Sequence, residues 1–257
     1  MSATIKTSED IIILREAGAR LARVVDEVSK MIAPGISIQE LDAHAERLIR
    51  EGGDVPAFLG YKPWGAKRKY PATMCISVNE EVVHGIPNED PRTLEEGDIV
   101  SIDCGLVHKG LIADHAITAI AGAGDKEAER LMRVTKESLM AGIKAAKGGN
   151  TIGDISAAIE AIGDKNEYGI VYALGGHGVG YEVHEEPFVP NVGDAGKGVV
   201  LEAGMVLAIE PMFTEGTDEV ILLPDGYTYV TKDGSRAAHF EHTVLITEGD
   251  AEILTAL

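Results

Sequence analysis

The 257-residue chain has few cysteines and no long apolar segment. Its two cysteines, Cys75 and Cys104, exclude a disulfide-stabilised scaffold at this length and favour a reducing compartment, the cytoplasm. No apolar run approaches the roughly 20 residues of a membrane-spanning helix. The polar N-terminus, MSATIKTSED, does not contain the apolar stretch of a signal peptide. We therefore expect a cytoplasmic protein without a membrane partner.

Basic residues are also scarce: 23 Lys and Arg stand against 42 Asp and Glu, which gives a formal net charge of −19. Phosphate contacts need cations, so this balance argues against a protein whose main task is to bind nucleic acid. One local exception is a basic loop, in which Lys62, Lys67, Arg68 and Lys69 surround Trp64. This loop is either a solvated charged surface or a small contact patch for an anionic partner.

The order of expected elements predicts one α+β domain over residues 1–257. Each half reads as a long helix, a glycine break, a shorter helix capped by Ser or Thr, and then strands, so Ser37 and Thr151 are expected to be equivalent. This pattern predicts a pseudo-two-fold domain with a cleft between the halves. Helices are expected at 8–32, from 37, at 126–146 and from 151, and strands at 73–78, 81–83, 99–103, 111–119, 170–174, 206–210, 220–223, 227–231 and 243–246.

Five residues have side chains of the kind that bind metal ions, and each stands in a short distinctive context. If they converge, four carboxylates and one imidazole carry a formal charge of about −4, which is unstable without cations because neighbouring carboxylates cannot all ionise. Two divalent cations about 3.5–4 Å apart would neutralise the cluster and activate water for hydrolysis. The sequence therefore predicts a dinuclear metallohydrolase. The five are Asp103 in SIDCG, Asp114 in IADHA, His177 in GGHGVG, Glu210 in AIEPM and Glu241 in FEHT.

The spacing of the two aspartates carries a geometric prediction. The midpoint between Asp103 and Asp114 falls between His108 and Lys109, where a hairpin turn is expected. In a symmetric hairpin the two side chains would face each other directly, with Cβ atoms about 4.5–5.5 Å apart. Glu210 and Glu241, taken singly, would more often be salt-bridged or capping residues, and it is the constellation that favours a metal site.

His177 stands in a glycine-dense segment, Gly175 to Gly180, that we interpret as a turn. A phosphate-binding loop is the alternative, but the Lys-Ser/Thr that would follow such a loop is absent. Singly, His84 and His184 are as compatible with a structural as with a catalytic role. We assign the remaining histidines to structural or surface positions; these are His44, His108, His115, His239 and His242.

Several of these motifs, in this order along nearly the whole chain, resemble those of the methionine aminopeptidases. The type I branch is favoured because only 25 residues separate His184 from Glu210, which leaves no room for the helical insertion of type II. The resemblance implies the pita-bread (creatinase/aminopeptidase) fold, in which helices lie outside a curved antiparallel sheet. The matching runs are CISVNEEVVHGIP, DIVSIDCG, GGHGVG with HEEP, AIEPM and FEHT.

The resemblance also implies roles for these residues. Asp103 would chelate one divalent metal ion (Co, Mn or Fe), Asp114 and Glu241 would bridge two, and His177 with Glu210 would hold the second. His84 and His184 would contact the substrate amide and stabilise the tetrahedral intermediate, and Glu210 would shuttle a proton. The expected activity is removal of the initiator methionine from nascent chains when residue two is small. A monomer is the family-like expectation.

A pocket for the methionine side chain is implied as well. Tyr70 and Cys75 match the family pattern, whereas Phe58 and Tyr61 match less closely because the 62–69 segment is longer than usual, and Tyr227 stands where tryptophan is frequent. Val183 replaces a frequent aromatic residue, so the pocket would be wider. Ordinary core packing is the alternative for these aromatic residues.

Three further hypotheses concern partners and rival functions. The basic loop could contact ribosomal RNA, since nascent chains are the expected substrate. A proline-directed peptidase of the same fold is the nearest rival, although such enzymes usually carry an extra N-terminal domain. A binding module that has lost its metals is the rival from another class.

Overall fold

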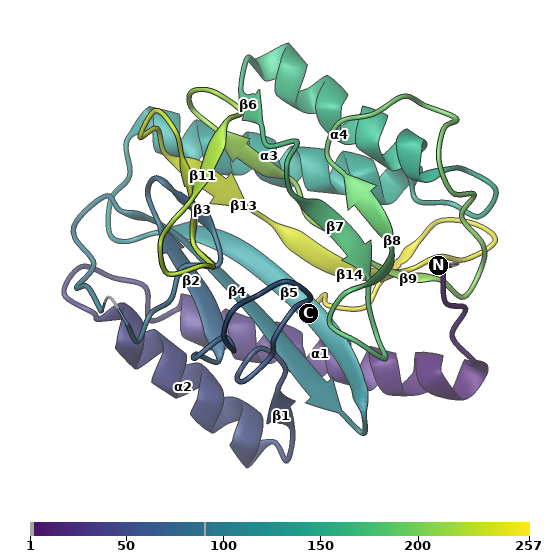
Figure 1. Ribbon diagram of the computed structural model, residues 1–257, viewed down its shortest axis with the longest axis horizontal. Coiled ribbons are helices and arrows are strands. Elements are labelled where there is room, and N and C mark those ends of the chain that lie inside the picture. The colour runs from purple at the N-terminus through teal and green to yellow at the C-terminus, as the bar shows by residue number, and fades with distance from the viewer. Residues whose placement is uncertain (1–2, 90) are drawn as a thin grey trace.

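The structure is a computed structural model that describes residues 3–89 and 91–257. Among these residues, four helices lie outside a central antiparallel sheet, and two small sheets flank it (Figure 1). The α+β architecture predicted from the sequence is confirmed. Within the described part of the chain, no helix combines the length and the apolar character that crossing a membrane requires.

Helices α1 (Ser8–Ser29) and α2 (Ile38–Glu51) cover the first half of the sheet. The apolar stripe of α1, which includes Leu14 and Leu21, is buried, and the helix packs against β4 (Ile99–His108) and β5 (Leu111–Ile120). The helix ends three residues before the predicted Ile32. Ala33 precedes a proline, and the residue before a proline disfavours the helical backbone.

Helices α3 (Lys126–Ala145) and α4 (Ile152–Asn166) cover the second half and repeat the first pair. The expected equivalence of Ser37 and Thr151 is visible in two contacts. The N–H of Ser37 donates to the carboxylate three residues later (3.0 Å), and the N–H of Thr151 does the same (2.7 Å). Each residue also forms an isolated β-bridge, with Thr93 and Val200 respectively. The two halves therefore share a local structure as well as an order of elements.

The central sheet takes strands from both halves, in the order β1-β4-β5-β14-β9-β7-β8, with β2 paired to β4 and β15 paired to β14. Its other strands are β1 (Val55–Pro56), β2 (Met74–Val78), β7 (Gly175–Gly178), β8 (Glu185–Pro190), β9 (Val206–Ile209), β14 (Glu241–Leu245) and β15 (Glu252–Ile253). The flanking sheets contain β13 (Ala237–His239), β10 (Met212–Thr214) and β6 (Gly169–Ile170), and β11 (Val220–Leu222), β12 (Tyr229–Thr231) and β3 (Glu81–Val83).

Four residues of the glycine-dense segment, Gly175–Gly178, form strand β7, so the prediction of a turn was wrong there. Strand β7 lies between β8 and β9, and both neighbours approach it closely. A Cβ added at Gly176 would overlap the carbonyl oxygen of Ala208, and one added at Gly175 would lie 2.6 Å from the carbonyl oxygen of Val189. The glycines are therefore needed for close packing between strands. In a sequence, glycines that allow close packing look the same as glycines that form a turn.

This packing predicts a large effect for a small substitution. Gly176→Ala should lower the free energy of unfolding by roughly 3 kcal/mol, because the backbone of β9 must move. Gly249→Ala is the matched control, since the nearest atom to its added Cβ is 3.9 Å away. Urea unfolding of both variants checks this, and equal stabilities would contradict it.

The register of the β4–β5 hairpin also differs from the prediction. Its closing pair is His108–Leu111, and the loop residues Lys109 and Gly110 both have positive φ (49° and 87°), as a type I′ turn requires. Asp103 consequently faces Ala116 rather than Asp114. The hairpin centre lies one residue later than predicted, which shifts the pairing by two. Because two is the period of a strand, the aspartates remain on one face as diagonal neighbours.

Candidate metal centre and substrate cavity

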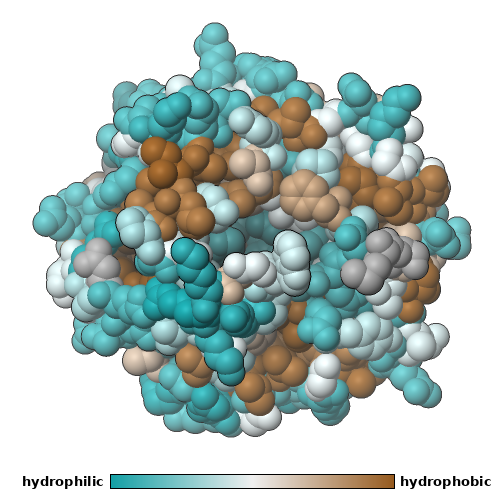
Figure 2. All heavy atoms as spheres, viewed as in Figure 1, coloured by the Kyte–Doolittle hydropathy of each residue, from teal (hydrophilic) through white to brown (hydrophobic). Residues whose placement is uncertain are grey.

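The twelve residues expected to act as metal ligands, catalytic groups or pocket walls all line one cavity of about 340 Å³. The face of the molecule that is seen in Figure 1 is hollowed near its centre, and apolar patches surround the hollow (Figure 2). The twelve come from both halves of the chain, so the fold brings together segments that are far apart in sequence. They are Phe58, Tyr61, Tyr70, Cys75, His84, Asp103, Asp114, His177, His184, Glu210, Tyr227 and Glu241.

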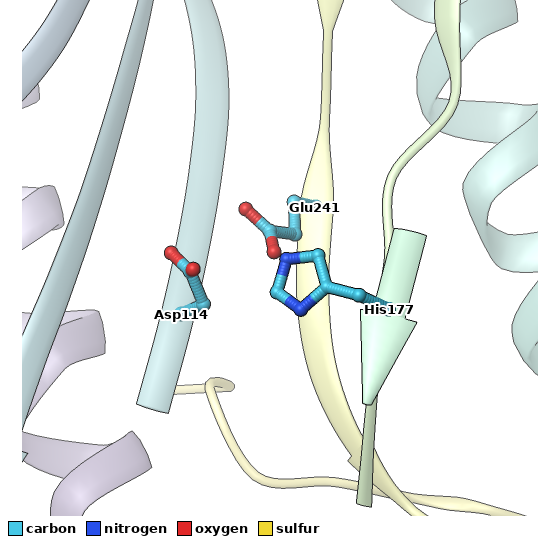
Figure 3. A group of neighbouring side chains, drawn as sticks. All are labelled: Asp114, His177 and Glu241. Atoms are coloured by element: carbon cyan, nitrogen blue, oxygen red, sulfur yellow. The ribbon is translucent and has the colours of Figure 1, made fainter. Parts of the chain in front are cut away.

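The five expected metal ligands come from five adjacent strands of the central sheet. Asp103, Asp114, Glu241 and His177 lie on β4, β5, β14 and β7, and Glu210 directly follows β9. One ligand atom each from Asp114, His177 and Glu241 lies within 4.8 Å of the other two, and Figure 3 shows these side chains pointing toward one another. This core of three can hold a metal ion, with the other two carboxylates in the same cavity.

Hydrogen bonds around the cluster fix the strands that carry it. The hydroxyl of Thr243 accepts from the N–H of Asp114 (2.9 Å) and donates to its carbonyl oxygen (2.7 Å). The Nδ1 of His115 donates to the carbonyl oxygen of Glu241 (2.5 Å). The ring of His115 also stacks on His242 at 4.7 Å. These contacts join β5 to β14 beside the expected metal ligands. They agree with the structural roles expected for His115 and His242.

The tautomer of His177 follows from its contacts. Its Nδ1 donates to the carbonyl oxygen of Gly178 (2.9 Å), which leaves the lone pair of Nε2 directed at Glu210, whose Oε1 is 3.4 Å away. Burial lowers the pKa of His177 to about 3, so the ring is neutral. A neutral imidazole whose second nitrogen is held by a carbonyl is the usual arrangement for a metal ligand.

The structure adds a contact for His239, which the sequence analysis assigned to a structural or surface position. Its side chain is buried, and its Nε2 lies 3.4 Å from Oε2 of Glu210, whereas His177 approaches the other carboxylate oxygen, Oε1. Glu210 thus lies between two imidazoles. A signal was available, because His239 precedes Glu241 by two residues and alternate residues of an extended chain share a face.

The electrostatics of the cluster fit a cation site. Burial raises the pKa of Asp103 to about 7, and burial with the charge of neighbouring carboxylates raises the pKa of Asp114 and of Glu241. Three buried atoms, Asp103 Oδ1, Glu241 Oε1 and His239 Nε2, have no hydrogen-bond partner among the residues described. Unsatisfied buried oxygens are costly, and divalent cations would satisfy them. The residues present therefore fit a metal centre.

These shifts predict how the metal-free protein responds to pH. A carboxyl group whose pKa is raised on folding binds its proton more tightly in the folded chain, so it stabilises the fold at low pH. That stability is lost as the pH rises from about 4, the unfolded value, through the folded value, about 7 for Asp103. The thermal midpoint of chelator-treated protein should fall by roughly 3 °C or more between about pH 5 and about pH 8.

The matching measurement is a pair of thermal melts, with and without Mn(II). Because metal binding displaces protons, Mn(II) should raise the midpoint more at the higher pH. A midpoint that is the same at both pH values without metal would contradict the prediction.

Two further histidines, His84 and His184, border the cluster. The ring of His184 meets His177 edge to face at 4.4 Å, and its Nδ1 lies 3.0 Å from the hydroxyl of Tyr61. His84 has a left-handed backbone (φ 61°), which is uncommon for a residue with a side chain and is typical of functional sites. Both histidines line a second cavity of about 610 Å³ as well as the first. They therefore lie between two spaces that could hold the two sides of a substrate.

The first cavity has an apolar part. The ring of Tyr70 meets that of Tyr227 edge to face at 5.1 Å. Both hydroxyl groups donate to backbone carbonyl oxygens: that of Tyr70 to Gly85 (2.8 Å) and that of Tyr227 to Arg68 (2.5 Å). Cys75 pairs with Asp103 across β2 and β4. The cavity thus offers rings and a thiol beside the carboxylates.

The basic loop borders the same cavity, since Trp64 lines it while its ring is fully exposed. Arg68 is not free for a partner, because its guanidinium pairs with Glu89 (Nη2–Oε2 2.7 Å) and Nε donates to the carbonyl oxygen of Asp225. The remaining basic residues of the loop, Lys62, Lys67 and Lys69, are exposed.

Comparisons with known proteins agree with this site. The family described as Metallopeptidase family M24 matches residues 13–248. A methionine aminopeptidase of Aquifex aeolicus is 46% identical over the whole of both chains, and methionine aminopeptidase 1 of Bacillus subtilis is 44% identical over 97% of this chain and 98% of its own.

Solved structures give the same result for the fold. The methionine aminopeptidase of Thermotoga maritima matches over the whole of both chains with a TM-score of 0.94 and 44% identity. A prolidase of Pyrococcus furiosus matches with a TM-score of 0.76 and 25% identity over 98% of this chain and 65% of its own. The expected pita-bread fold is confirmed, and the chain belongs to metallopeptidase family M24 and, within it, to the methionine aminopeptidases.

Proposed function

We propose that this protein releases methionine from the N-terminus of peptides and nascent chains when the second residue is small, with two divalent cations at its centre. The main support for the proposal is that the expected site residues come together in one cavity. Twelve residues chosen from separate motifs line one cavity, in which five metal-ligand side chains meet an apolar pocket. The relatives named methionine aminopeptidase support the choice of substrate.

The donor set suits two hard or borderline cations. Asp103, Asp114, His177, Glu210 and Glu241 would hold the two ions, and the close group of Asp114, His177 and Glu241 supports this assignment. Carboxylates with one imidazole suit Mn(II), Fe(II) or Co(II) better than ions that prefer thiolates. When bound, such ions supply Lewis acidity and a water molecule of lowered pKa.

The remaining chemistry falls to side chains of this chain. Glu210 accepts the proton of the attacking water and delivers it to the leaving amine. His184 donates a hydrogen bond to the carbonyl oxygen as negative charge develops there. His84 contacts the amide of the bond that is cut.

The apolar part of the cavity would hold the methionine side chain. Phe58, Tyr70 and Tyr227 present aromatic surface, and Cys75 lies among them. A polarisable thioether makes favourable contacts with aromatic rings. Val183 is buried and lines the same cavity, so we expect its small side chain to admit norleucine or leucine more readily than an aromatic residue there would.

The preference for a small second residue would come from the two histidines. The residue after the cut bond enters the space between His84 and His184, which line both cavities. A long or branched side chain there would displace an imidazole from the reacting carbonyl.

Three peptides test the proposal on metal-loaded protein: Met-Ala-Ser, Met-Leu-Ser and Ala-Pro-Ala. We expect methionine release from the first, much slower release from the second and none from the third. Cleavage of Ala-Pro-Ala in place of Met-Ala-Ser would assign the protein to the proline-directed branch. The absence of turnover on all three would favour a binding module.

The proposal extends to the domain organisation, the oligomeric state and the compartment of the enzyme. We propose that residues 1–257 act as one domain, supported by a central sheet that takes strands from both halves. We also propose a monomer in the cytoplasm, in line with two free cysteines, both buried.

The basic loop gives a separate prediction. Replacing Lys62, Lys67 and Lys69 by Glu should weaken cosedimentation with ribosomes, because a cationic contact with RNA phosphate is lost. Turnover of Met-Ala-Ser should stay within about twofold, since the three lysines are exposed and do not line the cavity. Unchanged cosedimentation would exclude ribosome contact through this loop.

A further inference from the structure

A buried ion pair lies beside His184, outside the residues that line the first cavity. The side chain of Lys6 is 0% exposed, and its Nζ lies 2.6 Å from Oε2 of Glu185, whose side chain is 8% exposed. Residues 6 and 185 are 179 positions apart, and Glu185 directly follows His184. A buried lysine is stable only when its charge is paired, so the position of each residue depends on the other.

The N-terminal arm, residues 3–7, is fixed to the sheet on the other side of the pair. The N–H of Lys6 donates to the carbonyl oxygen of Gly204 (2.8 Å), and Ile5 forms a β-bridge with Met205, just before β9. In Figure 1 the arm runs from the point marked N to the start of α1. Lys6 therefore extends from a fixed backbone.

Glu185 connects Lys6 to the His184 loop, residues 179–184, which joins β7 to β8. Its Oε1 accepts from the N–H groups of Tyr181 (2.6 Å) and Glu182 (3.2 Å), while Oε2 accepts from Lys6. The pair Gly178–Glu185 closes the loop at its base. Both oxygens of Glu185 are thus bonded, one to the arm and one to the loop that carries His184.

Two further contacts show that the loop is shaped around Lys6. Gly180 has a left-handed backbone (φ 139°), and a Cβ at this position would lie 2.5 Å from Cε of Lys6. The ring of Tyr181 lies 4.3 Å from Nζ of Lys6, and its hydroxyl donates to Asp10 (2.5 Å).

We propose that Lys6 is a positioning residue, whose ammonium group holds the His184 loop in its reactive place through Glu185. Without the Lys6 charge, Oε2 of Glu185 is buried and unpaired, so the carboxylate turns toward solvent and releases the two N–H groups of the loop. His184 then loses its alignment with the carbonyl to be cut. This inference rests on the proposed function, in which His184 stabilises the reacting carbonyl.

The test is a double-mutant cycle between Lys6→Met and His184→Ala on metal-loaded protein with Met-Ala-Ser. Lys6→Met should lower kcat by about 10–100-fold, the cost of a misplaced catalytic group, and change KM much less. In the His184→Ala background the same substitution should change kcat by no more than about twofold, because coupled residues are not additive. Equal losses in both backgrounds, or no loss in the first, would overturn the proposal.

Arg15→Met is the matched control, since it removes another cation paired with a glutamate, Glu252, at a half-exposed site on α1. It should leave kcat unchanged. Metal content and far-UV circular dichroism establish that each variant is loaded and folded. If Lys6→Met does not fold, Glu185→Gln takes its place in the cycle. The glutamine oxygen can still accept the two loop N–H groups, but its amide nitrogen is a donor and cannot accept from the Lys6 ammonium, so only the link to Lys6 is lost.

A crystal structure of Lys6→Met separates this proposal from the proposed function. Residues 181–184 should be displaced in Lys6→Met and unmoved in Arg15→Met. A wild-type protein that does not cleave Met-Ala-Ser would refute the proposed function, and an unmoved loop in Lys6→Met would refute the positioning role.

Discussion

Glu241→Gln should abolish metal binding and peptide hydrolysis together. Glu241 is buried on β14, its Oε1 has no partner among the described residues, and it lies within 4.8 Å of ligand atoms of Asp114 and His177. Glutamine keeps the shape and removes the charge that a bridging ligand needs. Because cations supply several kcal/mol of transition-state stabilisation, we expect kcat/KM to fall about 1,000-fold or more.

Metal content measured by mass spectrometry should fall with the activity. Glu219→Gln is the matched control, since this glutamate pairs with Lys232 on the surface, and it should keep both metal and activity. The metal-free Glu241→Gln protein should also be more stable than metal-free wild type above neutral pH, because one buried carboxylate with a raised pKa is gone. Retention of both ions by Glu241→Gln would contradict the ligand assignment.

His184→Ala should give the second large effect and should leave the metals in place. The imidazole borders both cavities and touches His177 without belonging to the close group of ligands. Removing one donor to a developing oxyanion costs about 100–1,000-fold in kcat. We expect a loss of this size with unchanged metal content.

The control for His184→Ala is His44→Ala. His44 bonds to Arg47 on the exposed face of α2, and its loss should not change kcat. If His184→Ala lost its metals, the residue would act as a ligand, and the proposed division between ligands and donors would be wrong. If it kept full activity, another group would have to stabilise the oxyanion.

The sequence predicted best what depends on neighbouring residues. The capping residues Ser37 and Thr151 were found because a cap and its partner are three positions apart. The aspartates of β4 and β5 were placed on one face because strand alternation survives a shift of two, although the predicted facing pair was wrong. The turn chemistry of Lys109 and Gly110, which sets the register, was not recognised.

What the sequence did not predict depends on contacts between distant segments. Strand β7 was interpreted as a turn because glycines carry no side-chain pattern, and their reason lies in β8 and β9. The contact of His239 with Glu210 was not predicted because it arises only when β13 pairs with β10, the strand that begins two residues after Glu210. The pairing of Lys6 with Glu185 joins the start of the chain to a loop in its second half, and neither residue alone indicates a partner.

A metal titration of activity tests the central claim most directly. Chelator-stripped protein would receive Mn(II), Co(II) or Fe(II) in measured equivalents, with methionine release from Met-Ala-Ser followed at each step. We predict no release without metal and recovery with at least one of these ions, with two ions bound at saturation. Release that persists without metal, or no release with any of the three, would contradict the proposed metal-dependent aminopeptidase.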